Sequence, residues 1–149
     1  MARIGRLSLL EKLFDTVYIP QAVYREVVLE GAGKPGSREV EEASWIRVAS
    51  AKNLALKRVL EARIDEGEAE AIVLALELGA EYVVLDEREA RLVAKRLGLS
   101  VAGTLGVLLW AKKQGLVENL AAELEKLKST GYRVSRALEE RILREAGEA

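Results

Sequence analysis

The chain has 149 residues, with 23 Lys and Arg, 24 Asp and Glu, and neither His nor Cys. Half of the residues are apolar and 32% are charged, which is typical of a globular chain and excludes a disordered one. The absence of His and Cys excludes serine–histidine and cysteine–histidine nucleophiles, the usual zinc sites and redox thiols. The length predicts a single domain over residues 1–149.

The predicted elements begin with Ser8 and Glu11, whose spacing is that of a capping box and predicts a helix over residues 9–14. A β-prone run at 17–19 ends at Pro20, which suits the first turn of a helix over 21–30. Further helices are predicted at 38–43, 54–62, 65–78, 87–97, 104–114, 117–128 and 136–146, and further strands at 45–49, 82–85 and 99–102. This alternation predicts an α/β fold with a mainly parallel sheet.

The loop between the second and third helices reads Gly-x-Gly-x-x-Gly at Gly31, Gly33 and Gly36. A nucleotide-binding loop of that pattern follows a strand and opens a helix. Here a helix precedes the pattern and Pro35 interrupts it, so we interpret it as a plain loop that ends a helix.

Charge and hydropathy predict where in the cell the protein is found. The net charge of −1 argues against a surface coated in basic residues. No apolar run reaches the ~18 residues of a membrane span, and the first one, ending at Glu11, is too short for a signal peptide. We therefore expect a cytoplasmic protein without a membrane partner. The scarcity of Asn and Gln beside many charged residues favours a thermophilic source.

Carboxylates are the abundant groups that remain for metal chemistry, and they favour Mg²⁺ or Mn²⁺. Asp86 directly follows the strand at 82–85, where ligands of parallel sheets bind, although it could instead cap the next helix. Glu68 lies in the first turn of its helix and could face a metal or complete a capping box with Asp65. Glu26 lies in mid-helix, where a solvated surface role is the alternative.

A cationic stripe follows Asp86. Arg88, Arg91 and Lys95 recur at helical spacing, so they could guide a phosphate backbone past the edge of the sheet. The alternative is a solvated face whose cations pair with nearby Glu residues.

Several stretches of the chain resemble known proteins. Residues Gly67-Glu68-Ala69-Glu70-Ala71-Ile72, Ala75-Leu76-Glu77-Leu78-Gly79-Ala80 and Val84-Leu85-Asp86-Glu87-Arg88 resemble PIN-domain proteins. Residues Ile19-Pro20-Gln21-Ala22-Val23-Tyr24-Arg25-Glu26-Val27-Val28 and Val101-Ala102-Gly103-Thr104-Leu105-Gly106-Val107-Leu108-Leu109 resemble one uncharacterised PIN-like subfamily. The resemblance implies a three-layer α/β sandwich with a short, mainly parallel sheet. It also implies a metal-dependent ribonuclease acting on single-stranded RNA, in many relatives a VapC-type toxin restrained by an antitoxin.

The resemblance also implies a set of site residues. The catalytic and metal-binding carboxylates would be Glu26, Glu68 and Asp86, with Glu89 as a fourth metal ligand. Arg88, Arg91 and Thr104 would bind the substrate, and Mg²⁺ or Mn²⁺ would be the cofactor.

The chain departs from the family pattern at its N-terminus. The family opens with a central strand that carries its first acidic residue, whereas residues 2–7 here correspond to the end of the following helix. We expect this N-terminal strand to be missing, through a late start, supply by another protomer or true divergence. An incomplete sheet favours homo-oligomers. The alternative function is a catalytically silent PIN-like module that acts by binding.

Overall fold

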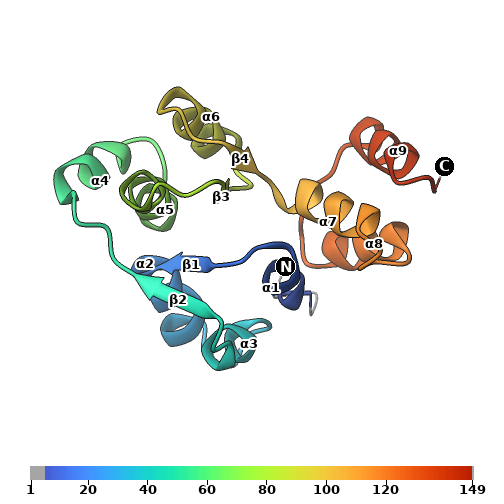
Figure 1. Cartoon of the computed structure of the whole chain (residues 1–149), viewed down its shortest axis with the longest axis horizontal. Coiled ribbons are helices and arrows are strands. Elements are labelled where there is room, and N and C mark those ends of the chain that lie inside the picture. Colours follow the sequence, from blue (N-terminus) through green and yellow to red (C-terminus); the bar gives the residue numbers. More distant parts are fainter. Residues whose placement is uncertain (1–5, 149) are drawn as a thin grey trace.

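The computed structural model describes residues 6–148, in which helices and strands alternate along the chain (Figure 1). The strands are β1 (Val17–Pro20), β2 (Ile46–Ala49), β3 (Val83–Val84) and β4 (Val101–Ala102). The α-helices are α1 (Ser8–Leu13), α2 (Gln21–Tyr24), α3 (Ser37–Glu42), α4 (Leu54–Leu60), α5 (Glu66–Leu78), α6 (Arg88–Arg96), α7 (Thr104–Lys113), α8 (Leu120–Ser129) and α9 (Arg136–Glu145). A π-helix, η2 (Arg25–Glu30), continues α2.

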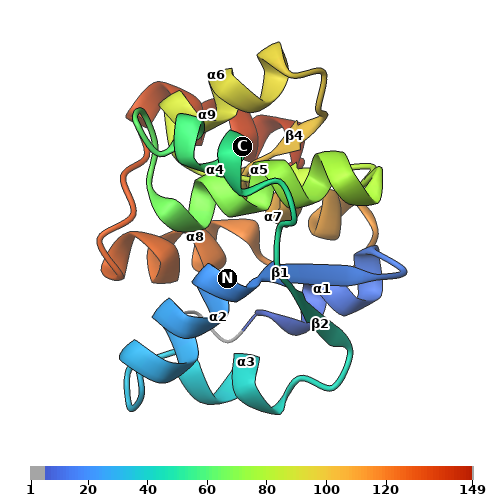
Figure 2. The ribbon, with the colours of Figure 1, turned by 90° about the vertical axis from the view of Figure 1, so that its left-hand side faces the viewer.

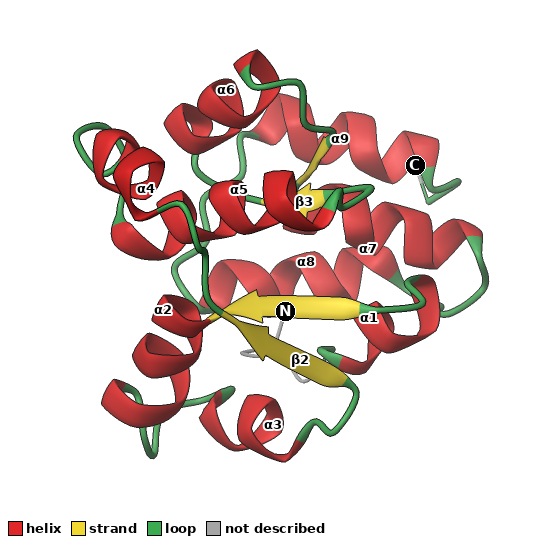
Figure 3. Ribbon diagram, turned by 60° about the vertical axis from the view of Figure 1, so that its left-hand side comes forward, coloured by secondary structure: helices red, strands yellow, loops and turns green. Residues whose placement is uncertain are grey.

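The strands confirm the α/β class and its short parallel sheets, but within residues 6–148 they form two sheets and not one. Strand β1 pairs in parallel with β2, and β3 pairs in parallel with β4. Figure 2 shows α5 and α6 above the β1–β2 pair and α3 below it. Figure 3 shows the two strand pairs apart, and α5 contacts both β1 and β3. The prediction of one sheet was therefore wrong, although the predicted direction of the strands was right.

Three local predictions are corrected. Ser8 lies inside α1 and not at its cap, because Leu7 occupies the N-cap position and makes no side-chain hydrogen bond. The helix predicted over 21–30 is α-helical only as far as Tyr24 and continues as η2. Helix α8 begins at Leu120 and not at Val117, because the Asn119 side chain accepts a hydrogen bond from the Ala122 N–H and caps it.

The buried apolar side chains form two clusters. The first joins α1, α7, α8 and α9 through residues such as Leu9, Leu108, Leu124 and Ile142. Helices α7, α8 and α9 gather at one end of the molecule, on the right in Figure 1. The second cluster joins α5, β3 and α6 through Ile72, Val83 and Ala90 among others. Within residues 6–148, no helix combines the length and apolarity needed to cross a bilayer.

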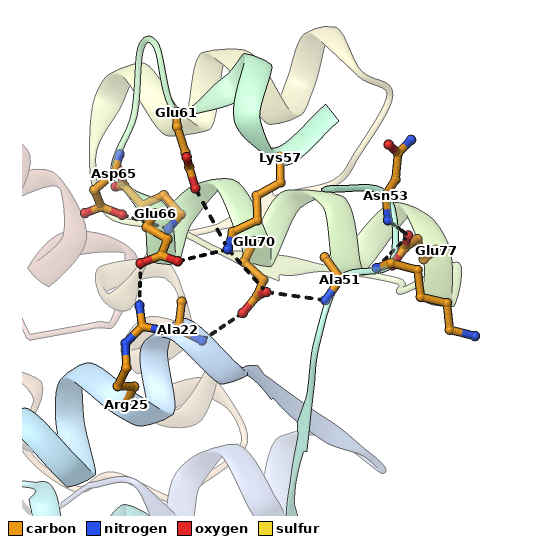
Figure 4. A network of polar contacts seen from close by, with 12 residues as sticks. Ala22, Arg25, Ala51, Asn53, Lys57, Glu61, Asp65, Glu66, Glu70 and Glu77 are labelled. Atoms are coloured by element: carbon orange, nitrogen blue, oxygen red, sulfur yellow. Dashed lines mark hydrogen bonds and ion pairs between the residues drawn. The ribbon is translucent and has the colours of Figure 1, made fainter. Parts of the chain in front are cut away.

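Helix α5 holds the neighbouring segments through its carboxylates (Figure 4). Glu70, of which 4% is exposed, accepts hydrogen bonds from the backbone N–H of Ala22 at 2.7 Å and of Ala51 at 3.4 Å. The ammonium group of Lys57 lies 2.9 Å from Glu66 and 3.7 Å from Glu70. Its hydrogen bond holds the pKa of Glu66 below the usual range. This network fixes α2, and with it the start of η2, against α5.

The N-terminus of α8 has a similar arrangement. The carboxylate of Glu148 accepts hydrogen bonds from the N–H groups of Leu120 at 2.6 Å and Ala121 at 3.0 Å, and it lies 3.2 Å from the ammonium group of Lys112. Burial opposes ionisation, but these partners outweigh it and lower the pKa of Glu148. The first N–H groups of a helix lack partners within the helix, so Glu148 supplies hydrogen-bond acceptors and a negative charge at the N-terminus of α8.

We expect Glu148→Gln to lower the free energy of unfolding at pH 7 by about 1 kcal/mol. Because the folded-state pKa lies below the ordinary Glu value of about 4.3, this contribution is present above that value and is lost as the pH falls through the folded-state pKa. Urea unfolding at several pH values between neutral and acid measures it. The difference between the two proteins should shrink on acidification, and parallel curves at all pH values would contradict the prediction.

Candidate functional site

A cavity of about 1300 Å³ opens where η2, β3, α6 and α7 meet the turn after α8. Its lining includes Glu26, Asp86, Arg91 and Thr104, which are four of the seven predicted site residues. The loop that carries Gly31 and Gly36 also lines this cavity, although its sequence pattern alone indicated no binding role. The cavity is therefore the candidate site.

Asp86 lies two residues beyond the end of β3, on the predicted side of the strand, and does not cap α6. The N-cap of α6 is Glu87, which makes no side-chain hydrogen bond. The carboxylate of Asp86 instead accepts three hydrogen bonds across the cavity wall. Its Oδ1 accepts from the Thr104 N–H at 2.9 Å and from the Tyr132 hydroxyl at 3.0 Å, and its Oδ2 accepts from the Thr104 hydroxyl at 2.7 Å.

Glu26 reaches the same cavity from η2. π-Helical turns are rare and occur frequently at functional sites. Gly31 permits the end of this turn, since a Cβ at that position would lie 2.7 Å from the Val27 carbonyl oxygen. Oε2 of Glu26 lies 3.7 Å from the point that a Cβ on Gly67 would occupy, so this carboxylate faces the first turn of α5.

Glu68 does not line the cavity. Its carboxylate accepts a hydrogen bond from the Asp65 N–H at 3.2 Å, and the Glu68 N–H donates to Asp65 at 2.7 Å, which is the predicted capping box. Burial, followed by the charges of Asp65 and Glu87, raises the pKa of Glu68 above its usual value. Two of the three predicted carboxylates, Glu26 and Asp86, therefore line one cavity, and the third has a capping role.

The predicted residues on α6 separate into two groups. Arg91 lines the cavity, and its Nη1 lies 3.2 Å from the point that a Cβ on Gly103 would occupy, with Asp86 Oδ1 3.5 Å from the same point. Arg88 and Glu89 do not line it, and Glu89 lies 3.7 Å from Arg63 in an exposed ion pair. Of the three predicted residues on α6, Arg91 therefore is the one that lines the cavity.

Sequence analysis missed further polar residues of the cavity, which include Glu30, Lys34, Glu87, Tyr132 and Arg133. Lys34 lies in the glycine-containing loop, and Tyr132 and Arg133 lie in the turn after α8. Lys34 and Arg133 bring positive charge to the cavity and Glu30 and Glu87 bring negative charge, whereas Tyr132 donates a hydrogen bond to Asp86. No motif marks these residues, because they reach the cavity only through the packing of distant segments.

The comparisons with known proteins identify the family of the chain. The family DUF3368, a PIN domain, matches residues 1–148 of the chain. The chain belongs to this PIN-domain family. No curated protein and no solved structure matches it. PIN domains are associated with nuclease function and generally use divalent metal ions.

The donor set of this PIN domain can be tested against such an ion. Glu26 and Asp86 offer carboxylate oxygens, and Mg²⁺ is commonly held by one or two carboxylates with water and substrate oxygens. Within the described range 6–148, no three acidic side chains lie close enough to hold an ion by themselves. The cavity thus offers carboxylate oxygens of the kind that a hard cation prefers, and most ligands of such a cation would be water and substrate oxygens.

Proposed function

We propose that this PIN domain is an Mg²⁺- or Mn²⁺-dependent ribonuclease that hydrolyses phosphodiester bonds of single-stranded RNA in the described cavity. The observation that carries the proposal is that Glu26 and Asp86, from segments 60 residues apart, open on one cavity with Arg91. Two carboxylates beside an arginine match the needs of a cation and a phosphate together.

Each side chain has a role that follows from its position. Glu26 and Asp86 would hold the cation, which when bound supplies a water of lowered pKa and polarises the phosphodiester. Thr104 and Tyr132 orient the carboxylate of Asp86. Arg91 binds oxygens of the scissile phosphate, and Lys34 and Arg133 neutralise its neighbours along the strand.

Cleavage of a fluorescent single-stranded RNA by the full chain tests the proposal, with Mn²⁺, Mg²⁺ or EDTA in the buffer. We expect cleavage with either cation and none with EDTA. Arg91→Gln should lower kcat/KM by about tenfold or more, because a charged hydrogen-bond donor to the phosphate is lost.

The matched control is Arg58→Gln. Arg58 lies at an exposed position of α4 and does not line the cavity, so this substitution should leave kcat/KM unchanged. The proposal fails if the folded chain cleaves no RNA with either cation. It also fails if the two arginine variants lose activity equally.

A second candidate, the catalytically silent binding module, has its own support. Each of the four described strands has only one pairing partner, so each sheet leaves two edges that a second copy or a partner protein could cover. In addition, Glu68 is engaged in its capping box. A chain that binds no Mn²⁺ and cleaves no RNA, yet self-associates in light scattering, would favour this candidate over the nuclease.

A further inference from the structure

Tyr132 is the one donor to Asp86 that comes from outside the β3–α7 region among the described residues. It lies in the turn after α8, 46 residues along the chain from Asp86. Its ring packs against the apolar cluster of α7, α8 and α9, which holds the hydroxyl in place.

The hydrogen bonds to Asp86 leave little of the carboxylate free. A carboxylate has about four acceptor positions, two on each oxygen. The Thr104 N–H and the Tyr132 hydroxyl fill both positions on Oδ1, and the Thr104 hydroxyl fills one on Oδ2. One position, on Oδ2, remains for a ligand from the cavity.

We infer that Tyr132 is a positioning residue that restricts Asp86 to binding a cation through one oxygen. The inference rests on the proposed function, because it takes Asp86 to be a cation ligand. Its consequence is selectivity. Mg²⁺ and similar small cations accept single carboxylate oxygens in octahedral sites, whereas Ca²⁺ takes 6–8 oxygens and often both oxygens of one carboxylate. An Asp86 held in this way therefore disfavours Ca²⁺.

Tyr132→Phe tests this inference, since it removes one hydroxyl and opens a position on Oδ1. The probes are MnCl₂ and CaCl₂, titrated by calorimetry into the full chain. We expect the affinity for Ca²⁺ relative to Mn²⁺ to rise by about fivefold or more, within the range that partners of metal ligands usually control. Tyr18→Phe, at an exposed position on β1 outside the cavity, is the control and should leave the ratio unchanged.

A second pair of variants keeps the test independent of how Tyr132→Phe folds. Thr104→Val removes the hydroxyl that occupies Oδ2 and should shift the ratio in the same direction, whereas Thr104→Ser keeps both donors and should preserve it. Thermal denaturation identifies the variants that are folded.

The outcomes separate this inference from the proposed function. If the unaltered chain prefers Mn²⁺ and the folded Tyr132→Phe and Thr104→Val variants keep its ratio, the inference alone is overturned. If the unaltered chain binds neither cation but Tyr132→Phe binds one, the proposed function is overturned and the role of Tyr132 is supported. If no protein in the series binds a cation, both are overturned.

Discussion

Asp86→Asn is expected to lower the rate of RNA cleavage by about 100-fold or more, because even the partners of metal ligands commonly contribute 10- to 100-fold. The substitution keeps the size of the side chain but removes its negative charge. It also replaces one acceptor oxygen by an NH₂ group, which cannot accept the hydrogen bonds that Thr104 and Tyr132 donate. The cation affinity and the cleavage rate should therefore fall together.

The measurement is kcat/KM for the same fluorescent RNA, with a Mn²⁺ titration on the same samples. Asp15→Asn is the matched control, since Asp15 is exposed in the loop between α1 and β1 and does not line the cavity. We expect the control to retain full activity. A folded Asp86→Asn protein within about threefold of the original rate would exclude Asp86 from the reaction, since a direct ligand should cost far more than that.

Glu70→Ala is expected to lower the free energy of unfolding by about 3 kcal/mol. The substitution leaves the N–H of Ala22 and of Ala51 without their acceptor, and it removes a carboxylate 3.7 Å from Lys57. It also leaves a cavity in the place of the Glu70 side chain, which is almost completely buried. Since Ala22 lies in the first turn of α2, which continues into η2, the position of Glu26 should loosen as well.

Urea unfolding followed by circular dichroism measures this effect. Glu70→Gln keeps one acceptor oxygen and should lose less stability than Glu70→Ala. The control is Glu41→Ala at an exposed position of α3, for which a change within about 0.5 kcal/mol is expected. Equal stabilities of Glu70→Ala and Glu41→Ala would show that the α5 network does not hold α2 in place.

The features that the sequence predicted best depend on residues that are close together along the chain. The capping box of Asp65 and Glu68 formed as expected, because both partners lie within one helical turn. Gly79 ends α5 with a left-handed conformation at φ 62°, and Ser135 caps α9. The positions of the four strands were also predictable from short β-prone runs, and their parallel direction followed from the helices between them.

The features that sequence missed depend on distant partners. Asp86 could equally have capped α6 by local criteria, and its interaction with Tyr132 requires the packing of α8 against α7. Glu70 lies in an apolar helix face, where only the approach of Ala22 and Ala51 explains a buried carboxylate. The division of the strands into two sheets likewise reflects long-range pairing, which no local pattern encodes.

The candidate cavity borders the first apolar cluster and the polar residues that follow β3 and lie on α6. On one wall, Leu105 and Leu127 belong to the apolar cluster of α7, α8 and α9. On another wall, Asp86 follows β3 and Arg91 lies on α6, and both of these elements contribute other residues to the second cluster. Asp86 already joins these walls through its hydrogen bonds with Thr104 and Tyr132, and a molecule that touches both walls adds to that connection. Occupancy of the cavity and the folding equilibrium of the chain are therefore thermodynamically coupled, and each must respond to a change in the other.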